Sequence, residues 1–154
     1  MNVFLKGVYQ KLAAYCAYQE RAEQEVRQRM QRYELSPDEA EALMEALRAD
    51  RFLSQERFAR SFARGKFYQN HWGAQKIRFA LRQKGVSDAL IRQALQQIPE
   101  ADYRQTLEEL LQKKLPQLKN TLSPLQKKQR LIAYAQQKGY EIELIQELLP
   151  NFDP

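Results

Sequence analysis

Apolar side chains recur along this chain at the spacing of amphipathic helices. The clearest case begins at Ser36, where a helix N-cap residue is followed by Pro37, a residue favoured in the first turn. The residues that follow carry an apolar stripe at i, i+3, i+4 and i+7, made of Ala40, Leu43, Met44 and Leu47. No segment alternates apolar and polar residues over more than about five positions, as a half-buried strand would. The pattern predicts an all-α fold.

The pattern also repeats at an interval of about fifty residues. Gln83-Lys84-Gly85 recurs as Gln137-Lys138-Gly139, and Val86-Ser87 corresponds to Leu35-Ser36 in an earlier copy. Each unit holds three helical stretches and only a small core, so we expect neighbouring units to stack end to end in an elongated or curved body. The predicted domains are three tandem three-helix repeats, at residues 1–50, 51–98 and 99–154.

Caps and glycines place the individual helices. Ser54 and Ser87 read as N-caps, Gly65 as an interruption, and Gly85 as the residue that ends a helix begun at Trp72 or Gly73. The other expected helices span residues 9–18, 21–33, 100–115, 123–138 and 140–149.

Composition excludes several classes of protein. No apolar run approaches the ~18–20 residues of a membrane span. The apolar stretch in the first six residues is too short for the core of a signal peptide. One cysteine among 154 residues gives no internal disulfide, and with a single histidine it makes a zinc site unexpected. Neither nucleotide-binding glycine fingerprint nor a nucleophile elbow is present. We read Cys16 as buried and inert, and His71 as a capping or surface residue. The expectation is a cytoplasmic protein that is not an enzyme and has no cofactor and no metal.

Charge is unevenly distributed along the chain. The formal net charge is +6, yet residues 1–50 carry −2, residues 51–98 carry +8, and residues 99–154 carry zero. A solvated surface normally mixes both signs. The middle repeat therefore suggests a binding face for phosphates or for an acidic protein surface, and a merely solubilising face is the alternative.

The candidate binding residues are the cations of the first two helices of the middle repeat. Three of them fall at i, i+3 and i+7 on one helix face, and the others lie on the next helix and beside it. They are Arg57, Arg60, Arg64, Lys66, Lys76, Arg78, Arg82 and Lys84. Alternatively, individual arginines pair with acidic neighbours such as Glu45, Asp50, Glu108 and Glu109. Among the nearby aromatics, Phe67 and Trp72 read as core, and Tyr68 is left open between core and base stacking.

Two motifs in the middle repeat carry a family resemblance. Residues 52–64 contain a hydrophobic-Leu pair, two polar residues, a charged residue and Arg-Phe-Ala, followed by a basic stretch. Residues 72–86 contain Gly-x-x-x-Ile-x-x-x-Leu-x-x-Lys-Gly-hydrophobic. Together they resemble the core of the RecX regulatory proteins, densely in the middle repeat and by architecture alone in the outer two.

The resemblance implies three tandem repeats related to helix-turn-helix units. It implies a regulator in DNA repair, the SOS response and homologous recombination, which lodges in the groove of the RecA nucleoprotein filament. There it would inhibit the ATPase, co-protease and strand-exchange activities of RecA by blocking or reversing filament extension. The expected partners are the RecA filament and, weakly through backbone contacts, single- or double-stranded DNA, with no membrane. We expect a monomer. Gly65 and the long joint from Leu115 to Ser123 depart from the family pattern.

Two other functions stay open at this point. A direct nucleic-acid binder without RecA dependence would place base-reading side chains early on an exposed second helix. Gln75 and Arg78 are candidates, but no such set recurs in the outer repeats, which disfavours sequence-specific reading. A plain helical interaction protein, whose charge is incidental, is the third possibility.

Overall fold

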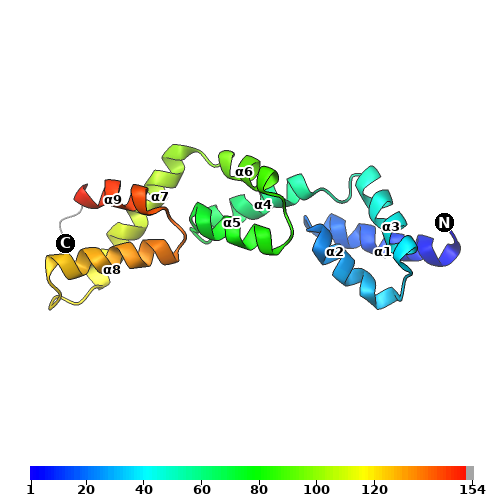
Figure 1. The fold of residues 1–154 in the computed structure, drawn as a ribbon, viewed down its shortest axis with the longest axis horizontal. Helices are drawn as coiled ribbons and strands as arrows, with labels where there is room; N and C mark the ends of the chain where they lie inside the picture. The colour runs from blue at the N-terminus through cyan, green and yellow to red at the C-terminus, as the bar shows by residue number, and fades with distance from the viewer. Residues whose placement is uncertain (152–154) are drawn as a thin grey trace. The chain divides into compact units, whose positions relative to one another are not determined.

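Helices are the only regular secondary structure in the part of the chain that the structure describes. The computed structural model describes residues 1–151, which form α-helices and short 3₁₀ turns and no β-strand. The α-helices, labelled in Figure 1, are α1 (Val3–Tyr18), α2 (Glu23–Met30), α3 (Pro37–Ala49), α4 (Gln55–Tyr68), α5 (Ala74–Gln83), α6 (Asp88–Gln96), α7 (Glu100–Lys114), α8 (Pro124–Gln137) and α9 (Ile142–Leu148). The 3₁₀ turns are η1 (Gln31–Tyr33), η2 (Leu115–Gln117) and η3 (Leu149–Asn151). The all-α prediction is confirmed, as is the order of three helices per repeat.

The chain forms two compact units. One contains Met1–Phe62 and Leu81–Ala94, and the other contains Ala63–Ala80 and the chain from Leu95 onward. The first unit holds the core of α1–α3, in which Leu12, Val26, Leu43, Met44 and Leu47 are fully buried. The second holds the core of α7–α9, in which Leu107, Leu111, Leu131, Ala135, Tyr140, Ile145 and Leu148 are fully buried. The predicted domain boundaries at 50/51 and 98/99 stay a prediction.

Four predicted helix starts are confirmed by their capping hydrogen bonds. The hydroxyls of Ser36, Ser54, Ser87 and Ser123 accept from the backbone N–H three residues on, at 3.1, 3.2, 3.3 and 3.2 Å. The helices that follow Ser36 and Ser123 also have a proline in the first turn, and Glu39 and Gln126 complete capping boxes. The first helix starts earlier than the predicted residue 9, because the Asn2 side chain accepts from the Leu5 N–H at 2.8 Å.

Two details of the sequence prediction change. The stretch 21–33 forms α2 and then the 3₁₀ turn η1, and the next residue, Glu34, has a positive φ of 49°. The predicted interruption at Gly65 is wrong: α4 runs through it, and the Gly65 carbonyl accepts from Gln69 N at 2.9 Å. A glycine costs a helix only about 1 kcal/mol, which the burial of Ala63 and Phe67 beside it can offset.

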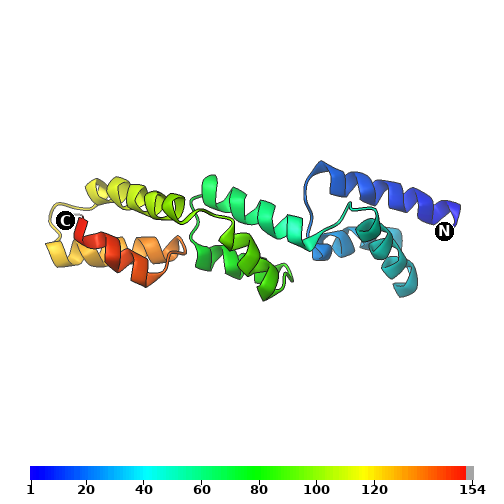
Figure 2. The same ribbon diagram turned by 90° about the horizontal axis from the view of Figure 1, so that it is seen from above.

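The second unit contains a tight backbone contact between two turns. Gly73 N donates to the Lys138 carbonyl at 2.7 Å, and Gln75 N donates to the Gly139 carbonyl at 2.9 Å. The Tyr140 hydroxyl donates to the His71 carbonyl at 2.9 Å, which reinforces the same joint. Figure 2 shows the α8–α9 turn beside the start of α5. Within this unit the start of α5 is thus fixed by the α8–α9 turn.

Candidate functional site

The eight predicted cations divide equally between the two compact units. Arg57, Arg60, Arg82 and Lys84 belong to the first unit, and Arg64, Lys66, Lys76 and Arg78 belong to the second. All four cations of the first unit lie within 4 Å of an acidic side chain.

Arg57 is held by an acidic residue of the first repeat. Its Nε lies 2.9 Å from Glu20 Oε1, and its Nη2 donates to the Arg51 carbonyl at 2.8 Å. The other Glu20 oxygen, Oε2, is buried and has no hydrogen-bond partner in the described part of the chain. Pairing with an acidic neighbour was the alternative considered for single arginines, and the partner here is Glu20 rather than any of the four acids named from the sequence.

The other three cations of this unit also have acidic partners. Arg60 pairs with Glu56 one turn away at 3.0 Å, Arg82 pairs with Asp88 at 2.9 Å, and Lys84 lies 3.8 Å from Glu25. The Arg60 and Arg82 pairs are exposed, and such pairs contribute about 0–1 kcal/mol. A ligand that offers a better anion could therefore displace Glu56 or Asp88 at little cost.

In the second unit, two lysines lie against the single tryptophan. The Nζ atoms of Lys66 and Lys76 are 4.8 and 4.6 Å from the centroid of the Trp72 ring. Cations this close to an indole face are attracted by its quadrupole. Trp72 is half-buried, so the core prediction for it is met only in part, whereas Phe67 is fully buried as predicted.

The two candidate arginines of this unit are Arg64, which is exposed, and Arg78, which is half-buried. The Arg64 guanidinium is 5.3 Å from the Tyr68 ring, and the Tyr68 hydroxyl donates to Asp102 at 2.8 Å, which raises the pKa of Tyr68. Arg78 is half-buried on α5, and the next residue, Phe79, is 65% exposed. Within residues 1–151, Arg64, Lys76 and Arg78 make no ion pair.

Sequence reasoning missed Phe79 as a surface residue. Ile77 and Leu81 are fully buried, as the apolar stripe of α5 predicted. Phe79 is two positions from each of them, so the helical period places it on another face. That count could have identified it in advance.

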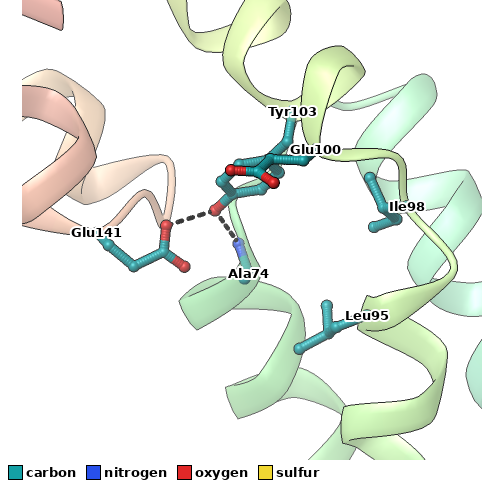
Figure 3. A pocket seen from close by; sticks show the side chains of 6 residues that line it. All are labelled: Ala74, Leu95, Ile98, Glu100, Tyr103 and Glu141. Atoms are coloured by element: carbon teal, nitrogen blue, oxygen red, sulfur yellow. Dashed lines mark hydrogen bonds between the residues drawn. The ribbon is translucent and has the colours of Figure 1, made fainter. Parts of the chain in front are cut away.

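A small pocket in the second unit is structural rather than reactive. Figure 3 shows its lining of Ala74, Leu95, Ile98, Glu100, Tyr103 and Glu141, which encloses about 220 Å³. The Tyr103 hydroxyl accepts from Ala74 N and donates to Glu141, both at 2.8 Å. Burial raises the pKa of Tyr103. A neutral phenol with both hydrogen bonds filled positions α5 against α7 and α9, and it offers no nucleophile.

A second set of cations lies in the first repeat, where the net charge is negative. Lys11, Arg21, Arg29 and Arg32 line one hollow together with three tyrosines. Counting charge over fifty residues concealed this group, because the acids of the repeat outnumber its bases. The spacing of Tyr15 and Tyr18, and of Arg29 and Arg32, at i and i+3 was the available signal.

Two further searches of residues 1–151 bear on function. No group of three or more His, Cys, Asp or Glu side chains in this range is placed to hold a metal ion. No helix in the same range has the length and apolar character that a bilayer crossing requires.

Comparison with known proteins identifies the family. Models of the first, second and third three-helix domains of RecX match residues 9–47, 54–95 and 101–149. A regulatory protein RecX from Prosthecochloris aestuarii is 32% identical over 135 residues, which cover 88% of this chain and 86% of that protein. The chain belongs to the RecX family.

Other RecX relatives are longer than this chain. The regulatory protein RecX of Oceanobacillus iheyensis is 26% identical over 149 residues, which are 97% of this chain and 54% of that protein. The one from Bacillus mycoides is 28% identical over 145 residues, which are 94% of this chain and 53% of that protein. The chain thus spans about half the length of these two RecX proteins.

Solved RecX structures share the fold. The crystal structure of RecX from Lactobacillus salivarius superposes with a TM-score of 0.87 at 19% identity and covers 97% of both chains. A second crystal structure of a regulatory protein RecX gives a TM-score of 0.86 at 21% identity, over 97% of this chain and 72% of the other. These likenesses establish the RecX fold of three helical repeats.

Proposed function

We propose that this chain regulates the RecA recombinase by binding in the groove of its nucleoprotein filament. Binding there inhibits the ATPase, co-protease and strand-exchange activities of RecA, within DNA repair, the SOS response and homologous recombination in the cytoplasm. The protein acts by contact and is not itself an enzyme. Membership of the RecX family of regulatory proteins supports this role.

The observation that carries the proposal is the composition of one set of residues of the middle repeat in the second unit. We call this set the middle-repeat surface, and it consists of Arg64, Lys66, Lys76, Arg78 and Phe79. Arg64, Lys76 and Arg78 have no acidic partner among the described residues, and Phe79 beside Arg78 is 65% exposed. Arginine and large aromatic residues are the side chains that most often dominate the free energy of protein–protein binding. Cations without an acidic partner also favour the phosphates of filament-bound DNA.

The eight predicted cations take different parts in this proposal. Arg64, Lys66, Lys76 and Arg78 make the primary contacts with RecA or with the DNA backbone. Arg60, Arg82 and Lys84 exchange weak acidic partners for the filament, whereas Arg57 mainly holds the first unit together.

The test is the ATPase activity of RecA on single-stranded DNA with this protein added below stoichiometry. The double variant Arg64→Glu/Arg78→Glu should weaken inhibition about tenfold or more, because it reverses two charges at the contact. The matched control, Lys128→Glu/Arg130→Glu, makes the same change in net charge at exposed positions of α8 and should stay within about twofold of wild type. Circular dichroism checks that both variants are folded.

Phe79→Ala separates a protein contact from a DNA contact. It leaves the charge unchanged, so it should weaken inhibition of RecA without altering binding to free single-stranded DNA. Equal inhibition by wild type and Arg64→Glu/Arg78→Glu would mean that RecA contacts another surface of the protein. If wild type binds free DNA but does not inhibit RecA at all, the protein is a direct nucleic-acid binder instead.

A further inference from the structure

An open hollow lies in the first repeat, between the second half of α1 and the elements α2 and η1. Its volume is about 690 Å³, within the range of about 300–1,000 Å³ typical of small-ligand sites. We call it the first-repeat hollow, and its lining is Lys11, Ala14, Tyr15, Tyr18, Arg21, Arg29, Arg32 and Tyr33. Half of these residues are cations, and none is acidic.

The cations of the hollow are not neutralised by the protein. Within residues 1–151, none of Lys11, Arg21, Arg29 and Arg32 makes an ion pair. Four positive groups around one concave surface raise the local potential and attract an anion.

Three acids of the repeat are already engaged. Glu23 pairs with Arg48 and Glu41 pairs with Arg27, both at 2.6 Å. Glu25, which lines an adjoining hollow with Arg29 and Arg32, accepts from Ala22 N at 2.8 Å and faces Lys84 at 3.8 Å. The repeat thus has more acids than bases, and yet a strongly basic hollow persists in it.

Tyrosine rings lie against three of these cations. The Arg21 guanidinium lies 3.8 Å from the centroid of the Tyr15 ring, and Arg21 Nε donates to the Tyr15 carbonyl at 2.9 Å. Arg29 lies 4.7 Å from the same ring centroid, and Lys11 lies 5.9 Å from that of Tyr33. Tyr18 is 83% exposed. The hollow therefore offers positioned cations beside an open aromatic face.

This combination fits one class of ligand better than others. Arginine forks bind phosphate oxygens, and aromatic faces stack on nucleobases, so a single nucleic-acid strand satisfies both. In a duplex the base faces are already stacked on each other and are closed to Tyr18. An acidic peptide would satisfy the cations and leave the exposed ring unused.

We propose that the first-repeat hollow binds single-stranded nucleic acid. Arg29 and Arg32 bind a phosphate, and Tyr18 stacks on a base. This site shares no residue with the middle-repeat surface and does not require RecA, so the proposal can succeed or fail independently of the function proposed above.

The test is fluorescence anisotropy of a labelled oligothymidylate about twelve nucleotides long, without RecA. Arg29→Gln/Arg32→Gln should weaken binding about tenfold and reduce the slope of log affinity against log salt by about 0.7, the value for one lost phosphate contact on a single strand. The control Arg27→Gln/Arg48→Gln removes the same charge from two cations that are engaged in ion pairs and should stay within about twofold. Thermal unfolding confirms that each variant is folded.

Tyr18 supplies the second readout. Tyr18→Ala should weaken binding at least about fivefold through lost stacking, and Tyr18→Phe should restore wild-type affinity because stacking needs no hydroxyl. The same assay with duplex DNA and with polyglutamate as competitors identifies the ligand class, and both should compete poorly.

Several outcomes would overturn the proposal. Equal losses in the Arg29/Arg32 variant and the Arg27/Arg48 control would mean that only total charge matters. Competition by polyglutamate as strong as by oligothymidylate would assign the hollow to an acidic protein segment. Wild-type affinity in Tyr18→Ala would mean that no base stacks on Tyr18, and the preference for a single strand would then lose its basis.

Discussion

Arg57 shows how one residue type can serve stability rather than recognition. It stands on the same face of α4 as Arg60, yet its guanidinium is shared between Glu20 and the Arg51 carbonyl. Glu20 is partly buried, with one oxygen that has no hydrogen-bond partner in the described part of the chain. A carboxylate in such a place depends on its cation, because removing one partner leaves an uncompensated charge.

We therefore expect Arg57→Ala to lower the free energy of unfolding by about 1–2 kcal/mol, between the values for exposed and buried pairs. Urea unfolding followed by circular dichroism measures this. Adding Glu20→Gln should recover part of the loss, because the orphaned charge is then removed. Inhibition of RecA by the folded variant should change less than twofold. A variant that keeps full stability but loses inhibition would instead place Arg57 in the partner contact.

At the scale of elements, the joint between the α4–α5 and α8–α9 turns depends on the absence of side chains. A Cβ added to Gly73 would lie 2.3 Å from the Gly139 carbonyl carbon. Gly139 has a φ of 102°, and a Cβ there would lie 2.5 Å from Lys76 Cβ. Both contacts involve atoms that cannot move without displacing the backbone or the start of α5. Gly65, in contrast, has nothing within 4 Å of an added Cβ.

Gly73→Ala and Gly65→Ala should consequently change stability in opposite directions. Gly73→Ala should destabilise the second unit by about 1–3 kcal/mol through overpacking. Gly65→Ala should stabilise the protein by up to about 1 kcal/mol, because alanine is the better helix former inside α4. Urea midpoints followed by Trp72 fluorescence compare the two variants. A Gly73→Ala protein as stable as wild type would mean that the two turns do not approach as closely as described.

The elements that sequence predicted well are those whose signals are local. Ser36, Ser54, Ser87 and Ser123 cap their helices through hydrogen bonds three residues away, so a short window contains the whole cause. At Gly65 the local helix propensity predicts a break, but the packing of Ala63 and Phe67 on either side keeps α4 continuous.

The candidate site was predictable only in part, for a related reason. The +8 charge of the middle repeat is a property of the sequence, but which cations are neutralised depends on tertiary contacts. Arg57 and Glu20 are 37 residues apart. Spacing could not indicate that these two side chains meet. The first-repeat hollow is the opposite case. The net charge of its segment is negative, but acids of that segment pair with cations outside the hollow, and the bases that line the hollow make no ion pair within residues 1–151.

For the whole molecule, the two compact units bury their tyrosines unequally. Burial raises the pKa of Tyr103 and of Tyr140, both in the second unit. In the first unit, burial and the hydrogen bond to Asp50 raise the pKa of Tyr9 to about 12. An unfolded tyrosine has a pKa of about 10. Above pH 10 the unfolded chain therefore binds fewer protons than the folded one, and stability falls as pH rises.

The fall should be larger in the second unit, where the pKa of two tyrosines is raised and Tyr140 is fully buried, whereas Tyr9 of the first unit is half-buried. Trp72, the only tryptophan, lies in that unit, whereas far-ultraviolet circular dichroism reports every helix. Between pH 8.5 and 10.5 the urea midpoint from Trp72 fluorescence should drop more than the midpoint from circular dichroism. Tyr103→Phe should lower the midpoint at pH 8.5, because Ala74 N and Glu141 lose their hydrogen bonds, and it should flatten the further drop at high pH. If the drop persists unchanged in Tyr103→Phe, the alkaline sensitivity does not come from this phenol.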